Sequence, residues 1–137
     1  MQFITRTKFN SKLANLLFTY ELQRKFEKHN LNIISVAAHP GVSATNLLKH
    51  VQKKLWFKIL YPLFSIFMQP AEMGTLPEVR ASVDLKVKGG EYFGPDGFNE
   101  MKGYPVIVKS NPASFNLENA KKLWELSEQL TTIIYHF

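Results

Sequence analysis

The chain has no cysteine among its 137 residues. Disulfide bonds, thiolate zinc sites and cysteine nucleophiles are therefore excluded, and any redox chemistry needs an external cofactor. The histidines at 29, 50 and 136 show no spacing typical of a metal site, and we expect none. A sequence without thiols is compatible with the cytosol.

The sequence also lacks an apolar run long enough to cross a bilayer. Its most apolar stretch, residues 55–68, is about 14 residues long and includes Lys58, whereas a spanning helix needs about 20 apolar residues. Residues 1–7 carry an arginine, but no secretory leader pattern follows them. We expect a cytoplasmic protein. The alternative is a peripheral membrane contact through residues 55–68, since Lys53, Lys54 and Lys58 accompany aromatic side chains there.

Charge of one sign does not gather in a block. The formal net charge is +6, but the basic residues are spread along the whole chain. This distribution is typical of a solvated basic surface. No zinc-finger, RNP-type or helix-turn-helix pattern accompanies it, so we expect no nucleic-acid partner.

Apolar periodicity predicts a helix over residues 11–28. One stripe recurs at i, i+3, i+4 and i+7, the spacing of a single helix face: Leu13, Leu16, Leu17 and Tyr20. Either Asn10 or Ser11 would cap its start, because their side chains accept a hydrogen bond from a first-turn amide.

Residues 31–38 form a continuous apolar and β-branched run that ends at Pro40-Gly41. Such a run predicts a strand buried on both faces of a parallel sheet. A helix followed by this strand is half of a βαβ unit, and no strand precedes the helix. We therefore expect a truncated chain.

The remaining elements are predicted from apolar spacing and turn formers. They are a helical turn at 47–52, helices at 55–68 and 71–83, a short strand within 89–95, and a helix at 116–133. Asn116 is expected to cap the last helix, whose apolar stripe comprises Leu123, Leu126 and Leu130. Pro77 makes the middle of the 71–83 helix less regular.

No repeat or linker divides the chain, so we predict one domain over residues 1–137. Two parallel strands make a thin sheet, and at least three strands are usually needed for stability. We therefore expect a homo-oligomer, or pairing with a separate chain that supplies the missing N-terminal half.

Four segments, in this order and spacing, closely resemble the retinol-dehydrogenase-like branch of the short-chain dehydrogenases/reductases. They are residues 11–24 (SKLANLLFTYELQR), 39–45 (HPGVSAT), 89–97 (GGEYFGPDG) and 120–128 (AKKLWELSE). The chain resembles the C-terminal half of such an enzyme. The resemblance implies an α/β, incomplete Rossmann-like (doubly wound) fold, a C-terminal portion with few parallel strands and several helices.

The resemblance gives Lys12 the role of the family's catalytic lysine, which donates hydrogen bonds to the nicotinamide ribose. In the family, this lysine also lowers the pKa of a tyrosine four residues earlier on the same helix face. That position holds Lys8 here, and the nearest aromatic residue, Phe9, has no hydroxyl either. A missing general acid typically costs a factor of about 10²–10⁴ in rate, so we expect carbonyl reduction to be crippled.

Pro40, Gly41, Val42 and Thr45 match the family's loop that holds the nicotinamide carboxamide with backbone groups and a hydroxyl. Glycine permits close approach of the backbone, and open α/β sheets bind ligands at the carboxyl ends of their strands. We expect His39 to support this turn rather than to act as an acid or a metal ligand.

The family's glycine-rich turn, which seats the cofactor pyrophosphate at a helix N-terminus, has no counterpart in this sequence. The chain has seven glycines, and none forms that motif. We therefore expect NADP or NAD, the cofactors of intact relatives, to bind this chain only weakly on its own.

Residues 55–68 match the family's substrate-covering segment. Four of its side chains would line a hydrophobic entrance, unless they serve as ordinary core or dimer contacts: Trp56, Phe57, Leu60 and Phe64. We thus expect a short-chain dehydrogenase-like oxidoreductase for lipophilic carbonyls or alcohols, inactive alone. The alternatives are a non-catalytic module that pairs with an N-terminal half, and a membrane-surface protein.

Overall fold

The computed structural model of the protein describes residues 2–42 and 69–137, with side chains from Ser11 onward. These residues form two compact units. The described part of the first comprises residues 2–37, 87–91 and 109–137; that of the second comprises residues 38–42, 69–86 and 92–108.

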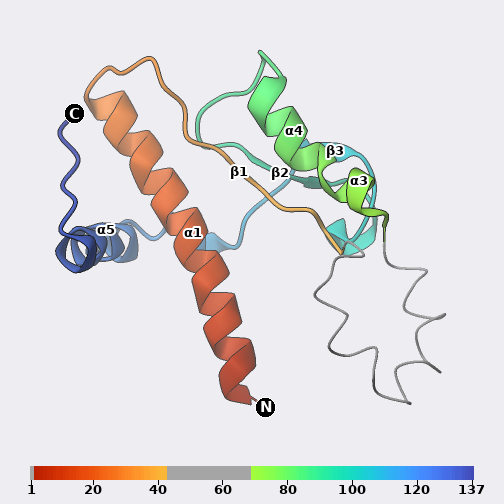
Figure 1. Cartoon of the computed structure of the whole chain (residues 1–137), viewed down its shortest axis with the longest axis horizontal. Helices are drawn as coiled ribbons and strands as arrows, with labels where there is room; N and C mark the ends of the chain where they lie inside the picture. The colour runs from red at the N-terminus through yellow and green to blue at the C-terminus, as the bar shows by residue number, and fades with distance from the viewer. Residues whose placement is uncertain (1, 43–68) are drawn as a thin grey trace. The chain divides into compact units, whose positions relative to one another are not determined.

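The first unit is built on two helices, α1 (Gln2–Lys28) and α5 (Leu117–Thr131), with the 3-10 turn η3 (Pro112–Phe115) against α1. Figure 1 shows α5 almost end-on beside α1, so the two helices cross. Their contact is aromatic: the rings of Phe18 and Trp124 stack with centroids 5.1 Å apart. A stacked pair adds about 0.5–1.5 kcal/mol to the burial of its area.

The apolar stripe predicted on α1 supplies this core only in its second half. Leu17 and Tyr20 are buried, whereas Leu13 and Leu16 are half-buried. The Tyr20 ring stacks on Phe115, and its hydroxyl donates a hydrogen bond to Ser110 at 2.9 Å. One side chain therefore ties η3 to the helix through both its apolar ring and its polar tip.

The two predicted helix caps have opposite outcomes. The prediction that Asn10 or Ser11 caps α1 is wrong, because the helix already begins at Gln2. Residues 2–10 contain neither glycine nor proline, so nothing breaks the helix there. Asn116 does cap α5, since its Oδ1 accepts a hydrogen bond from the Asn119 amide at 2.8 Å.

The buried face of α5 differs from the predicted one. Ala120 and Trp124 are buried, whereas Leu126 and Leu130 are 51% and 77% exposed. Ala120 and Trp124, which are four residues apart, face α1, because the Trp124 ring buries more area than Leu126 or Leu130. The predicted Leu123, Leu126 and Leu130 stripe therefore lies largely toward solvent.

Three short strands form one sheet in the order β1 (Ala37–Ala38), β2 (Tyr92–Pro95) and β3 (Pro105–Ile107). The Ala37 amide donates to the Glu91 carbonyl at 3.0 Å, and the His39 amide donates to the Phe93 carbonyl at 2.9 Å. The bonds advance along both segments in the same direction, so β1 and β2 are parallel. β2 and β3 are antiparallel.

The prediction of a buried strand over residues 31–38 is wrong for most of its length. Only Ala37 and Ala38 form strand, and the side chains of Ile33 and Ile34 are 55% and 50% exposed. Their position explains the difference, because β1 lies at the edge of the sheet, whose order is β1-β2-β3. The amide of Ser35 instead donates to the side chain of Gln23 at 2.8 Å.

In the second unit, the helices α3 (Ala71–Gly74) and α4 (Leu76–Val83) precede β2 in the chain. Helix α4 packs on β2 and β3. The single helix predicted over 71–83 is therefore divided. Pro77 lies in the first turn of α4, where its missing amide hydrogen costs nothing. Phe93 in β2 is the core of this unit, with 1% of its surface exposed.

The mixed α/β, Rossmann-like class predicted from the sequence is confirmed, with one parallel and one antiparallel strand pair. β2 lies within the predicted 89–95 segment, whereas β3 was not predicted. The helices predicted at 47–52 and 55–68 lie outside the described residues. Over residues 2–42 and 69–137, no helix combines the length and apolar character that a bilayer span requires.

Candidate functional site

The turn that follows β1 contains three of the predicted cofactor-binding residues, Pro40, Gly41 and Val42. Gly41 has a φ of +61°, in the left-handed region that favours glycine. A Cβ atom at this position would lie 2.5 Å from the carbonyl oxygen of Met101 and 2.8 Å from that of Glu100. The turn is therefore a close approach of two backbones, which only glycine permits.

His39 supports this turn through both ring nitrogens. The amide of Gly41 donates to Nδ1 at 3.2 Å, and Nε2 lies 2.9 Å from Oε2 of Glu100. Since Nδ1 accepts a hydrogen bond, the geometry assigns the proton to Nε2, which donates it to the carboxylate. A Cβ atom on Gly94 would collide with the imidazole, so the ring fills the space that this glycine leaves. The predicted supporting role of His39 is consistent with this geometry.

Gln69 fastens the turn from the other side. It is 4% exposed, and its Nε2 donates to the carbonyl of Pro40 at 2.8 Å. The Oε1 of Gln69 accepts from the amide of Gly103 at 2.9 Å. The backbone amide of Gln69 donates to the carbonyl of Val42 at 3.0 Å. Gln69 is not among the site residues predicted from the sequence. The only signal is a polar residue that follows a long apolar stretch and precedes a proline.

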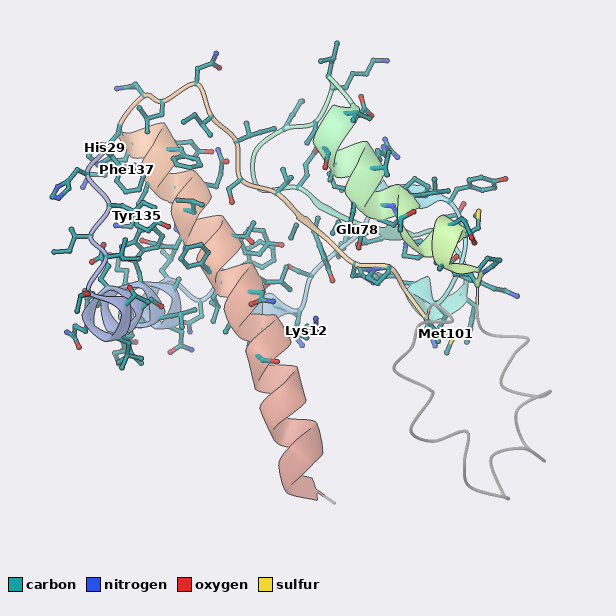
Figure 2. The ribbon with its side chains drawn as sticks, in the orientation of Figure 1. Lys12, His29, Glu78, Met101, Tyr135 and Phe137 are labelled. Atoms are coloured by element: carbon teal, nitrogen blue, oxygen red, sulfur yellow. The ribbon has the colours of Figure 1, made fainter. Side chains whose placement is uncertain are left out.

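The loop between β2 and β3 forms the other wall of the site. The amide of Val42 donates to the carbonyl of Met101 at 2.7 Å, and Figure 2 marks Met101 at this end of the unit. Asn99 and Glu100 have φ values of +49° and +56°. Left-handed backbone costs a non-glycine residue about 1–2 kcal/mol, so two successive ones need the surrounding hydrogen bonds to hold them.

The hydrogen bonds of the turn decide which of its groups remain for a ligand. Both amides of the turn donate hydrogen bonds within the unit: that of Gly41 to Nδ1 of His39, and that of Val42 to the carbonyl of Met101. Over residues 2–42 and 69–137, no hydrogen bond reaches the carbonyl oxygen of Gly41. The turn therefore offers an acceptor rather than a donor.

Lys12 lies in the first unit, on the exposed part of α1. The helix runs from Gln2 to Lys28, so position 8 lies one turn before Lys12 on the same face, as the predicted i, i+4 relation requires. Four residues of the predicted site lie in the described chain, Lys12 in one unit and Pro40, Gly41 and Val42 in the other. The rest lie outside it: Thr45, Trp56, Phe57, Leu60 and Phe64.

The end of α1 is fixed to the segment before β1 by Gln23. Its Oε1 accepts from the Ser35 amide at 2.8 Å, and its Nε2 donates to Glu27 at 2.9 Å. The side chain is 9% exposed and occupies the space above Gly89, where a Cβ atom would collide with it. The Gly89-Gly90 pair of the sequence motif thus serves the packing of α1.

No family model matches the chain, but individual proteins do. It is 34% identical over 128 residues to human retinol dehydrogenase 14, a match that covers 90% of this chain and 34% of that protein. Human polyprenol dehydrogenase is 32% identical over 128 residues, with 90% and 35% covered. The chain belongs to the short-chain dehydrogenase family. The chloroplastic short-chain dehydrogenase TIC 32 A of Brassica napus is 32% identical over 125 residues, with 88% of this chain and 35% of that protein covered.

The fold agrees with this membership. A crystal structure of an uncharacterized protein from Mycobacterium paratuberculosis superposes with a TM-score of 0.65 and 28% identity, covering 93% of this chain and 39% of that one. The chain spans about a third of the length of the curated relatives it matches. The recognition of a retinol-dehydrogenase-like sequence is therefore confirmed for the segment that this chain represents.

Proposed function

We propose that this chain forms the nicotinamide side of an NAD(P)-dependent oxidoreductase of the short-chain dehydrogenase type, and that the polypeptide does not turn over by itself. The observation that carries the proposal is the turn after β1, where Gly41 brings backbone against backbone at the carboxyl end of a parallel strand. This is where open α/β sheets bind ligands.

The chemistry of the turn fits a carboxamide. The carbonyl of Gly41 receives no hydrogen bond from residues 2–42 or 69–137, and an amide NH₂ group would donate to it. Thr45 would supply the hydroxyl that the family uses at this loop. His39, Gln69 and Met101 hold the turn in place, so binding need not order it first, which reduces the entropic cost.

In the first unit, Lys12 would hold a nicotinamide ribose, the role that the family resemblance gives it. Its ammonium group is exposed, and it has no carboxylate partner among the described ion pairs. It can therefore donate to two neighbouring hydroxyls. NAD(P)H would supply a hydride when bound, and Lys12 would orient its ribose. The family resemblance assigns contact with a lipophilic carbonyl to Trp56, Phe57, Leu60 and Phe64.

The proton for the carbonyl oxygen has no evident donor of the family type. Position 8, one helical turn before Lys12, is a lysine in place of the family's tyrosine. None of the seven glycines makes a pyrophosphate turn. The residues present thus fit the nicotinamide ribose and not the adenosine or the phosphates, and turnover by this polypeptide alone is not expected.

Nicotinamide mononucleotide tests the proposal, because it contains only the half of the cofactor that the chain fits. In an NMR titration it should shift the amides of Gly41 and Val42 saturably, with millimolar affinity, whereas ADP-ribose should not. NADPH should bind no more than a few-fold more tightly than the mononucleotide and should not reduce retinal or aliphatic aldehydes. Absence of any shift with the mononucleotide, or micromolar NADPH binding with turnover, would contradict the proposal.

A second role, pairing with a complementary half or a second copy, is favoured by the exposed edge at β1. Ile33 and Ile34 are about half exposed beside an edge strand, an arrangement that favours addition of another strand. This role is tested by sedimentation analysis of the chain alone and of the chain mixed with the N-terminal half of a related dehydrogenase, the half that contains the glycine-rich turn. A monomer that gains no partner in either experiment would argue against it.

A further inference from the structure

A cavity of about 190 Å³ lies in the first unit, between α1, α5 and the segment that follows α5. Three aromatic rings wall it, those of Phe18, Trp124 and Tyr135. Its polar lining comes from one face of α5, where Ser127, Glu128 and Thr131 meet it. Neither the turn after β1 nor Lys12 contributes to it, so it is separate from the proposed cofactor site.

The C-terminal segment forms one wall of the cavity. Thr132, with a φ of +57°, ends α5 in the left-handed conformation that turns the chain away from the helix axis. Tyr135 then lies 5.4 Å from Trp124, and Phe137 lies 5.9 Å from Phe26, measured between ring centroids. Figure 2 shows Tyr135 and Phe137 directed from this segment toward α1. The wall is therefore held by aromatic contacts rather than by secondary structure.

The polar groups that α5 presents to the cavity are acceptors. The hydroxyls of Ser127 and Thr131 donate to carbonyls one helical turn earlier, each at 2.7 Å, and the Thr131 oxygen also accepts from the Ile133 amide at 3.3 Å. The Ser127 oxygen therefore keeps both lone pairs for a ligand, and the Thr131 oxygen keeps one. The indole Nε1–H of Trp124 donates a hydrogen bond to Oε1 of Glu128 at 2.7 Å. That bond fixes the carboxylate at the wall of the cavity, and no lysine or arginine in the described residues forms an ion pair with it.

We propose that this cavity binds a small aromatic amine, a single ring with a short aminoalkyl arm. The ring would pack against Phe18, Trp124 and Tyr135, and the ammonium would donate to the free oxygen of Glu128 and to the neighbouring hydroxyl oxygens. Aromatic faces combined with a carboxylate suit an organic cation. The size agrees, because a dry cavity of about 150 Å³ accommodates benzene.

The positive charge of Lys25 lowers the affinity of this site for a cationic ligand. The Nζ of Lys25 lies 4.5 Å from the ring centroid of Trp124, so it places a like charge at a ring that the cationic ligand would contact. A Lys25→Met variant keeps the apolar stem of the side chain and removes that charge. The variant should therefore bind the amine several-fold more tightly, with the gain shrinking as salt is added.

Three single-ring probes of similar size separate charge from shape: benzylamine, benzyl alcohol and benzoate. The indole N–H signal of Trp124, assigned with a Trp56→Phe variant, reports binding by NMR in the full chain. Benzylamine should shift this signal saturably, benzyl alcohol should bind at least several-fold more weakly, and benzoate should not bind. Equal affinities for the three probes, or no saturable shift with benzylamine, would overturn the proposal.

The carboxylate is tested with a matched pair of variants on the same helix. Glu128→Gln keeps an oxygen that accepts from the Trp124 indole and loses the charge, so the fold is retained while benzylamine affinity falls at least tenfold. Glu125→Gln removes an exposed charge from α5 and should leave the affinity unchanged. If the two variants weaken binding equally, general electrostatics rather than this cavity accounts for it, and the proposal fails.

Discussion

Gln69 donates a hydrogen bond from Nε2 to the carbonyl oxygen of Pro40 at 2.8 Å. The other end of the same amide accepts from Gly103 at 2.9 Å. One buried side chain therefore joins the turn after β1 to the loop before β3, with one hydrogen bond to a backbone group of each. The position of the candidate cofactor turn depends on this amide.

Replacing Gln69 with alanine should destabilise the second unit by about 2 kcal/mol, because it removes the acceptor of the Gly103 amide and a donor to the Pro40 carbonyl. Hydrogen exchange at the Gly103 amide, together with urea unfolding followed by circular dichroism, measures the loss. Gln129→Ala, on the exposed side of α5, is the control and should change stability by less than about 0.5 kcal/mol. Equal effects of the two variants would show that the hydrogen bonds of the Gln69 side chain contribute nothing to the stability of this unit.

Gly41→Ala tests the close approach of the two backbones. The new Cβ atom would lie 2.5 Å and 2.8 Å from carbonyl oxygens that cannot move independently, in addition to the strain of φ = +61°. Gly90→Ala is matched for strain, with φ = +80°, but its Cβ atom would meet nothing closer than 3.9 Å. We expect Gly90→Ala to cost about 1 kcal/mol and Gly41→Ala to cost clearly more, by thermal or urea unfolding. Similar losses would mean that the turn relaxes away from Met101.

Local spacing predicts helices well in this chain and predicts strands poorly. The cap at Asn116 and the apolar face around Leu17 and Tyr20 follow from residues within one or two turns of each other, so both could be inferred from the sequence. The edge position of β1, which leaves Ile33 and Ile34 exposed, depends on which strands are its neighbours. A run of β-branched residues carries no information on that point.

The candidate site shows the same division. The turn at Pro40-Gly41 was predicted from a motif whose residues are adjacent in the chain. Gln69 and Glu100, which hold that turn, are separated from it by 29 and 61 positions, and nothing in their local sequence indicates the contact. A glutamine and a glutamate are also common surface residues, so their types gave no signal.

Gly89 and Gln23 should be strongly coupled. Alanine at position 89 would drive the Gln23 side chain away from the Ser35 amide and leave that amide unsatisfied, so we expect a loss of about 1–3 kcal/mol. In a Gln23→Ala background the three atoms nearest to the new Cβ are absent, and the same substitution should cost much less. A double-mutant cycle by urea unfolding gives the coupling energy. Additive effects would show that the Gln23 side chain has another low-energy position.

Lys12→Met should separate binding from stability. The side chain is exposed on α1, so the unfolding free energy should change by less than about 0.5 kcal/mol. If Lys12 holds the ribose, the shifts that nicotinamide mononucleotide causes at Gly41 and Val42 should weaken at least several-fold. Lys28→Met, at the other end of the same helix, removes an equal charge and should not weaken them. Loss of binding in both variants would indicate a general charge effect.

Asp84 provides a pH-dependent contact at the end of α4. The Lys86 amide donates to its Oδ1 at 3.0 Å, and this bond, assisted by Arg80, lowers the pKa of the carboxyl from its usual 3.8. A lowered pKa means that the contact contributes stability above pH 3.8 and loses it as the pH falls through the folded-state value. An NMR titration of the Asp84 carboxyl should give a midpoint below 3.8. Arg80→Met should raise that midpoint only in part, because the backbone hydrogen bond from Lys86, the larger cause, remains. A midpoint at or above 3.8 in the unmodified chain would show that the bond does not persist in solution.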